Sequence, residues 1–429
     1  MNTELSVLPK AKYLLSTFFL TCSFSAFSQQ LVPLTYQDYM DKVTKGNLEY
    51  AAEQLNVQVS EAEIVAAKVF NDPNLAATYY YNENNSLQMG EGFEFELSKT
   101  FSFGKRSAGI ALANNQKELT EAVLADYFRN LRAAATVSYL EALKQEELYR
   151  VKQESYNDFR QLAVSDSIRF VLGKIKELDA TQSKLEAGIM YNELLQAKVE
   201  LYNAFADLNL LTGSAENTAL YQPNASMKLE PRLFILSSLV STAVDNRTDV
   251  IVARKNSQLA SGELLVTRRE RNTDIDVSLG LSKNARVYND EAPAPPFTGI
   301  SAGLSIPLKF SNFNKGAVKA AQFREQQAEV QYQQVQLQVQ TEVMQAYRSY
   351  LSLAEQLKRF ENDMLDKAKE VLEGKRYSHQ RGEVSLLEVL DAQRTYNDVK
   401  VQYIETLFNY CVAVVELEKS AGIWDVNLQ

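Results

Sequence analysis

The fold is decided by residues 137–162, which read VSYLEALKQEELYRVKQESYNDFRQL. Large apolar residues recur in this stretch at the α-helical period of about 3.6, and charged residues fill the positions between them. The surrounding segment from Ile110 to Leu172 contains neither glycine nor proline. It therefore predicts one striped helix on the order of 95 Å long. Helices in globular cores average only about 11 to 12 residues.

The composition favours long helices and argues against several classes of function. The 429 residues include only 16 Gly and 9 Pro, although 45% are hydrophobic. After residue 30 no uncharged apolar run reaches the ~18 residues of a transmembrane helix. The net charge of −9 gives no electrostatic case for nucleic-acid binding. One histidine, seven methionines and no Walker-type motif leave no support for a catalytic triad, a metal site or nucleotide hydrolysis. We therefore expect no enzyme activity, no cofactor and no metal site.

The N-terminus has the pattern of a secretory signal peptide covering residues 1–28. Lys10 and Lys12 precede an apolar run that ends in a small-x-small cleavage pattern. The alternative is a buried first helix. Cys22 lacks the small preceding residue of a lipoprotein signal, so we expect it to be discarded with the peptide. Cys411 then remains alone, and we expect it to act as a small core hydrophobe.

The mature chain is built from two copies of one unit, because motifs recur at matching separations. Leu75–Tyr81 aligns with Ile275–Leu281, and Gly173 aligns with Gly382. Each copy is expected to contain an amphipathic helix (about 35–69 and 233–269), a strand hairpin, a long helix and a returning helix. The predicted organisation begins with a signal peptide (1–28), followed by a first repeat (29–211) with a hairpin at about 75–103 and long helices at about 105–211. A linker (212–232) then wraps around the helices. The second repeat (233–422) has a hairpin at about 275–310 and long helices at about 315–421, and a tail (423–429) ends the chain. The second long helix is expected over 317–373.

Four segments, at about 75–81, 93–97, 275–281 and 300–306, alternate between apolar and polar or small residues, which is the period of a β-strand, and they pair as two hairpins. Ile275, Val277 and Leu279 alternate with polar or small residues, and Ile300–Ile306 does the same. Each strand is close to the ~9 to 11 residues that cross a bilayer as a tilted strand. Two hairpins cannot close a barrel, but three symmetry-related chains would pool twelve strands. The fold class is therefore mainly α with a small β part.

These features together resemble the TolC-type outer membrane efflux proteins. The most specific motif is Gly382–Gln393, GEVSLLEVLDAQ, which follows the second helix turn. The resemblance covers almost all of the mature chain. It implies a homotrimeric α-helical barrel that continues into a 12-stranded transmembrane β-barrel, with four strands per chain. It also implies an outer-membrane location in contact with lipid, a periplasmic extension, and docking to a periplasmic adaptor protein and an inner-membrane pump.

The resemblance places a pore constriction near the two helix turns. Glu388 and Asp391 lie three residues apart, hence on one helix face, and match acidic positions that project into the pore at its closed tip. A ring of such carboxylates would bind cations. The alternative is an ordinary solvated helix face. Asp179 matches a position that latches neighbouring helices, and its alternative role is to complement a helix dipole. Val384 stands where the family has a basic latch residue, and His379 stands where it has a tyrosine.

Two further groups of residues are candidate contact sites. The helix turns at Gly173, Lys174, Arg381 and Gly382 are expected to dock the adaptor, because glycine allows a sharp reversal. A set of aromatic residues is expected to form membrane-interface girdles, the alternative being the core of a soluble sandwich. These are Tyr79, Tyr80, Tyr81, Phe93, Phe101 and Phe103.

An alternative to the channel belongs to another class. In this alternative the chain is a periplasmic or secreted structural coiled coil whose hairpins only mediate self-assembly. The exported cargo is not encoded in any of the motifs above.

Overall fold

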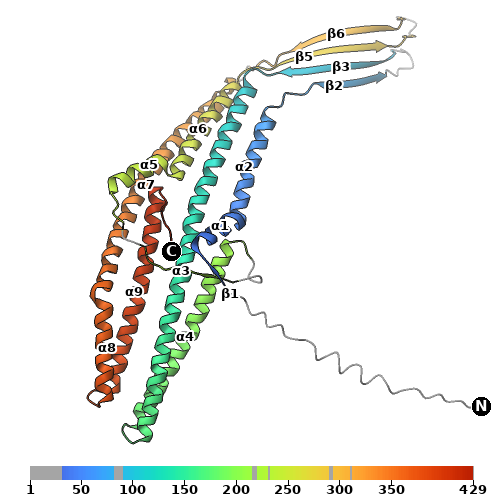
Figure 1. The fold of residues 1–429 in the computed structure, drawn as a ribbon. Helices are drawn as coiled ribbons and strands as arrows, with labels where there is room; N and C mark the ends of the chain where they lie inside the picture. The colour runs from blue at the N-terminus through green and yellow to red at the C-terminus, as the bar shows by residue number, and fades with distance from the viewer. Residues whose placement is uncertain are drawn as a thin grey trace, which may run out of the picture.

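The protein is an elongated assembly of helices with a small β-sheet at one end (Figure 1). The structure, a computed structural model, describes residues 31–81, 90–214, 220–229, 232–288, 293–309 and 312–428. The expected signal peptide with Cys22, the strand connections at 82–89 and 289–292, and residues 310–311 lie outside the described residues. The described elements are β1 (Leu31–Leu34), α1 (Tyr36–Gly46), α2 (Leu48–Ala67), β2 (Asn74–Tyr81), β3 (Glu91–Phe101), α3 (Lys105–Val171), α4 (Glu177–Leu211), β4 (Leu220–Pro223), α5 (Leu236–Asn246), α6 (Thr248–Arg269), β5 (Ile275–Asn284), β6 (Phe297–Ser305), η1 (Asn312–Asn314), α7 (Lys315–Arg359), η2 (Phe360–Met364), α8 (Leu365–Gln380) and α9 (Leu386–Ala421).

The longest helix is α3, which runs without a break for 67 residues. This confirms the single helix expected from the striped sequence. Its counterpart in the second half is also continuous from Lys315, but it contains the π-helical turn η2 at Phe360–Met364. A π-turn widens the helix by one residue and shifts the faces that follow. No glycine or proline marks this position, so the helical pattern gave no sign of it.

The helices that precede the two strand hairpins are each broken once, so the prediction of single helices over 35–69 and 233–269 was wrong. The breaks fall at Asn47 and Arg247, which both have extended backbone. Asn47 accepts a hydrogen bond from the Tyr50 amide through its side chain and so begins a new helix. Gly46 packs so tightly that a Cβ there would overlap the carbonyl oxygen of Thr212. Arg247 instead donates to Asp249 of the same turn and to Glu342 of α7.

The core lies at mid-length, where the N-terminal and C-terminal segments meet the long helices. Tyr39, Tyr139 and Tyr410 are fully buried there. The Tyr139 hydroxyl donates to the Leu34 carbonyl at 2.8 Å and accepts from the Asn224 amide at 3.1 Å. It thereby fixes the parallel pair β1–β4, which the sequence did not predict. Cys411 is also fully buried in this cluster, as expected of a small hydrophobe.

The two strand hairpins form one sheet in the order β2-β3-β5-β6, with all neighbours antiparallel. They were expected as separate hairpins within the chain. The link is the pairing of β3 with β5, in which Phe95 lies opposite Leu281 and Leu97 opposite Leu279. Because β3 and β5 occupy the centre, the outer edges of β2 and β6 have no strand beside them in the described chain.

The close approach at Gly46 gives a stability test. Gly46→Ala should lower the free energy of unfolding by about 1–3 kcal/mol, because the added methyl group overlaps a backbone carbonyl. Gly109→Ala in α3, where the methyl group meets nothing within 4 Å, should raise it by about 0.5–1 kcal/mol. Denaturant unfolding of the detergent-solubilised protein, followed by circular dichroism, measures both changes. Equal stability of the two variants would contradict the packing described here.

Candidate functional site: a two-faced sheet and a helical tip

The four-stranded sheet has one apolar face and one polar face. The register places the apolar side chains of neighbouring strands opposite one another and leaves them exposed. Ile300, for example, is 85% exposed and Leu75 is 68% exposed. The apolar face carries Leu75, Ala77, Tyr79, Phe93, Phe95, Leu97, Val277, Leu279, Leu281, Ile300, Ala302 and Leu304, with the charged residues Glu91, Lys99 and Lys283 toward the strand ends. The opposite face carries mainly polar and small residues: Thr78, Glu94, Glu96, Ser98, Ser278, Gly280, Ser282, Gly299, Ser301 and Gly303, together with Ala76, Tyr80 and Phe297.

An exposed apolar sheet face next to a polar one is unusual for a water-soluble protein, in which large apolar patches are covered. It is the alternation expected of strands that face lipid on one side and water on the other. None of the described helices is both long and apolar enough to cross a bilayer.

The aromatic residues singled out from the sequence lie in or next to this sheet. Tyr79 and Phe93 pair across β2 and β3, with ring centroids 4.9 Å apart. Tyr80 is half-buried and packs over Gly92, where a Cβ would overlap its hydroxyl group. Tyr81, Phe101 and Phe103 are exposed. They are therefore not part of a buried sandwich core in the described chain, because no second sheet layer covers them.

The opposite end of the molecule is formed by two helix turns (Figure 1). Gly173 lies in the α3–α4 turn just after α3, and Gly382 lies in the α8–α9 turn just after α8, with φ of +70° and +80°. Both values lie in the left-handed region that glycine adopts without strain. Lys174 is exposed, and Arg381 forms an ion pair with Glu383 at 2.9 Å. The two turns are therefore charged and open to solvent.

The acidic candidates lie close to these turns. Glu388 is the third residue of α9 and completes a capping box with Ser385. Its carboxylate also accepts a hydrogen bond from Lys375 at 2.7 Å. The Lys375 hydrogen bond, followed by that from the Ser385 amide, lowers the pKa of Glu388. The stability that these bonds contribute is thus present above the ordinary carboxyl pKa and is lost as pH falls through the lowered value.

Asp391 and Asp179 differ in their surroundings. Asp391 is exposed and lines, together with Glu388 and Lys375, a surface cavity of about 280 Å³ between α8 and α9. Asp179 is half-buried in the first turn of α4, where a negative charge complements the helix dipole. The structure therefore brings Glu388 and Asp391 to one cavity, but Asp179 is not among the residues that line it.

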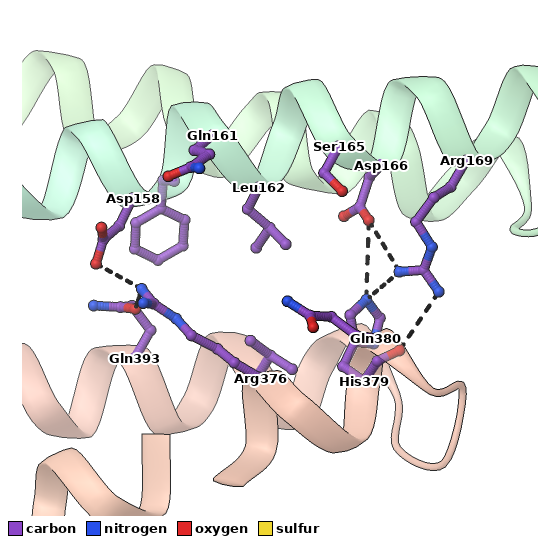
Figure 2. Close-up of a pocket in the computed structure, with 12 residues that line it drawn as sticks. Asp158, Gln161, Leu162, Ser165, Asp166, Arg169, Arg376, His379, Gln380 and Gln393 are labelled. Atoms are coloured by element: carbon purple, nitrogen blue, oxygen red, sulfur yellow. Dashed lines mark hydrogen bonds and ion pairs between the residues drawn. The ribbon is translucent and has the colours of Figure 1, made fainter. Parts of the chain in front are cut away.

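A second cavity, of about 390 Å³, separates the two helical hairpins just above the turns (Figure 2). Asp166 of α3, only 1% exposed, accepts from Ser183 of α4 at 2.5 Å and from Arg169 at 3.4 Å. Arg169 also donates to Nε2 of His379 at 3.0 Å. Since arginine cannot accept, His379 carries its proton on Nδ1 and donates to the Val384 carbonyl at 3.1 Å.

Polar bonds continue along the contact between the hairpins. Arg376 of α8 donates to Asp158 at 2.5 Å. Arg394 of α9 donates to both carboxylate oxygens of Glu186 at 2.8 Å. We call this set the inter-hairpin seam; its members are Glu154, Ser155, Asp158, Asp166, Arg169, Glu186, Arg376, His379, Arg394, Asn397 and Lys400.

Most of the seam was not singled out from the sequence. One signal was present: Asp166 follows Phe159 and Leu162 at helical spacing, so a carboxylate occupies a position where the apolar stripe predicts a hydrophobe. His379 was noted only as a departure from the family pattern. Among the described residues no cluster of three His, Cys, Asp or Glu side chains could hold a metal ion.

The two-faced sheet and the long paired helices define a class of protein in which an elongated helical body carries a small β-sheet with one apolar face and one polar face. Residues 239–423 match the model of the outer membrane efflux protein family. The chain is 24% identical over 396 residues to the cobalt-zinc-cadmium resistance protein CzcC of Cupriavidus metallidurans, over 91% of this chain and 90% of that protein. It is 22% identical over 356 residues to the outer membrane protein TolC of Salmonella enteritidis, over 79% and 68% of the two chains.

The fold is also that of a solved channel. The crystal structure of the Campylobacter jejuni CmeC outer membrane channel matches with a TM-score of 0.75 at 16% identity, over 90% of this chain and 85% of that chain. Residues 239–423 thus belong to the outer membrane efflux protein family, and the likeness to CzcC and TolC extends over most of the chain. The protein is an outer-membrane efflux channel with a periplasmic extension, and its family is one of channels and not of enzymes.

The inter-hairpin seam gives a second stability test, in which one charged side chain of the seam is replaced by a neutral one. Arg394→Gln should lower the free energy of unfolding by about 1.5–3 kcal/mol, because Glu186, 3% exposed, loses a charge-assisted hydrogen-bond partner. Adding Glu186→Gln should restore most of the loss, since no buried charge then remains. Arg359→Gln, which breaks a mostly exposed pair with Glu355, should change stability by less than about 1 kcal/mol. Denaturant unfolding compares the variants, and an unchanged Arg394→Gln protein would contradict the seam.

Proposed function

We propose that three copies of this chain close into one channel, with twelve strands forming a transmembrane barrel. The supporting observation is the two-faced sheet, whose apolar side chains are exposed and whose outer strands β2 and β6 lack a neighbour in the described chain. In hydrocarbon each unpaired N–H or C=O would cost several kcal/mol. Rotational symmetry pairs β6 of one chain with β2 of the next and removes every edge.

The apolar face then contacts lipid and the polar face lines the lumen. Serine and glycine dominate the polar face, and small side chains fit the concave side of a closed sheet. At the other end, the turns at Gly173, Lys174, Arg381 and Gly382 meet a periplasmic adaptor. The adaptor connects the duct to an inner-membrane pump, which supplies the energy that a passive channel lacks. The helices between the two ends form the wall of the periplasmic duct.

The constriction of this duct is proposed to lie near Glu388 and Asp391. Both carboxylates share one cavity, and threefold symmetry would repeat them around the lumen as a ring. Lys375 offsets part of the charge of Glu388, which leaves Asp391 as the more strongly exposed negative charge. Asp179 is proposed to contribute to the contact between neighbouring helices at the same level.

The channel and the self-assembling coiled coil differ in their response to a charge on the sheet. Leu281→Arg places a cation on the apolar face, where transfer into the bilayer costs about 2–4 kcal/mol. Ser282→Arg places the same side chain on the polar face. We expect Leu281→Arg to reduce the amount of trimer in alkali-washed outer membranes at least severalfold, and Ser282→Arg to leave it nearly unchanged. Recovery of the wild-type chain as a soluble monomer after alkaline extraction would rule out the channel and favour the structural coiled coil.

The proposed constriction has its own electrical test. Glu388→Lys combined with Asp391→Lys reverses the ring charge, so cation selectivity and block by multivalent cations should fall strongly in single-channel recordings. Glu405→Lys, an exposed position farther along α9, is the matched control and should change both properties little. Unchanged selectivity and block in the double variant would remove these residues from the constriction.

A further inference from the structure

Basic side chains gather where the helices meet the sheet, although the whole chain has a net charge of −9. We call this band the basic collar; it consists of Lys68, Lys105, Arg106, Arg268, Arg269, Arg271, Lys309, Lys315 and Lys319. These residues flank the end of α2, the start of α3, the end of α6 and the start of α7. All four helix ends lie beside the strands (Figure 1). Only Asp72, Glu270 and Asp274 offset the collar within these same segments.

Helix dipoles do not explain this arrangement. Arg268 and Arg269 are in the last turn of α6, where cations are favoured. Lys105 and Arg106 begin α3, and Lys315 begins α7, where the positive end of the helix repels them. Neither first turn contains an acidic residue, and neither helix has a side-chain cap at its N-terminus. Several cations therefore accumulate at the positive end of each of these two helices.

Part of the collar is engaged within the chain and part is free to bind. Lys105 pairs with Asp274 at 2.6 Å, and Arg106 donates to the Lys68 carbonyl at 2.6 Å. Arg268, Arg271 and Lys315, by contrast, are exposed and form no ion pair within the described residues. An acidic protein thus carries several uncompensated cations in one narrow band.

A second observation indicates what this band faces. Large apolar side chains are exposed in the same strand ends and connecting segments that carry the collar. They are Phe70, Phe101, Phe103, Ile306, Leu308 and Phe313. The guanidinium of Arg106 lies over the Phe70 ring, 3.7 Å from its centroid. Aromatic rings beside cations suit the headgroup level of a bilayer, where apolar bodies and polar tips meet different solvents.

We propose that the basic collar binds the phosphate headgroups of anionic phospholipids in the periplasmic leaflet of the outer membrane. The inference rests on the proposed membrane position of the sheet. The lipid phosphates supply the anions that the exposed cations lack, and they meet the positive ends of the α3 and α7 helix dipoles. Bound lipids would fix the depth of the barrel, because the collar can descend no farther than the headgroup layer.

The test compares two triple variants of the full chain. The collar variant combines Arg268→Gln, Arg271→Gln and Lys315→Gln. The matched control combines Lys184→Gln, Lys198→Gln and Lys358→Gln, which are exposed positions on helices away from the strands. The purified proteins in neutral detergent are titrated with phosphatidylglycerol or phosphatidylcholine, and bound lipid is measured by native mass spectrometry.

Phosphatidylglycerol should bind the wild type more tightly than phosphatidylcholine. The collar variant should lose roughly 100-fold in affinity, because each basic residue near an anionic surface contributes about a factor of five. The control variant should bind like the wild type. Equal binding of the two lipids by the wild type, or unchanged binding by the collar variant, would overturn the proposal. Displacement of phosphatidylglycerol by inorganic phosphate would also overturn it, since free phosphate would then be the ligand.

Failure of the collar can be told apart from failure of the channel. If the sheet does not enter membranes, the wild type will not insert into phosphatidylcholine vesicles at all. If the wild type inserts as a trimer and still shows no preference for phosphatidylglycerol, only the collar proposal is wrong.

Discussion

The structure depends on one constraint, the need of every strand edge to find a hydrogen-bond partner. The sheet β2-β3-β5-β6 exposes its apolar face and leaves the outer edges of β2 and β6 open. Water could satisfy those edges but would not favour the exposed leucine, isoleucine and phenylalanine side chains. Lipid favours those side chains but cannot satisfy the edges. Pairing with further copies, as proposed above, would resolve both requirements, and a single chain would then carry a third of the barrel.

The helices hold the sheet and the turns at a fixed separation. An unbroken 67-residue α3 reaches from the collar to the tip, and the mid-length core around Tyr139 ties it to both chain halves. Toward the tip this apolar core gives way to the inter-hairpin seam. Charged and polar hydrogen bonds such as Arg376–Asp158 require a defined geometry. They therefore set the relative orientation of the two hairpins without filling the space between them. The cavity beside Asp166 remains as a result.

The sequence predicted those elements whose signals are periodic. The stripe through Phe159 predicted α3, and the alternation at Ile275–Leu281 predicted β5. The breaks at Asn47 and Arg247 were missed because they depend on contacts with distant segments, including the Thr212 carbonyl and Glu342. The pairing of β3 with β5 joins residues far apart in the chain and leaves no local mark. Glu388 and Asp391 were brought to one cavity as the helical spacing predicts, whereas the partners of Asp166 could be identified only in three dimensions.

The central claim is that β2 and β6 pair across chains. Amide hydrogen exchange of the protein in lipid nanodiscs, read by mass spectrometry, tests it directly. In a closed barrel the β2 and β6 amides should exchange as slowly as those of β3 and β5, because every one is hydrogen-bonded. If the sheet stays open, alternate amides of β2 and β6 should exchange at the rate of an unfolded peptide while β3 and β5 stay protected. That second pattern would contradict the account.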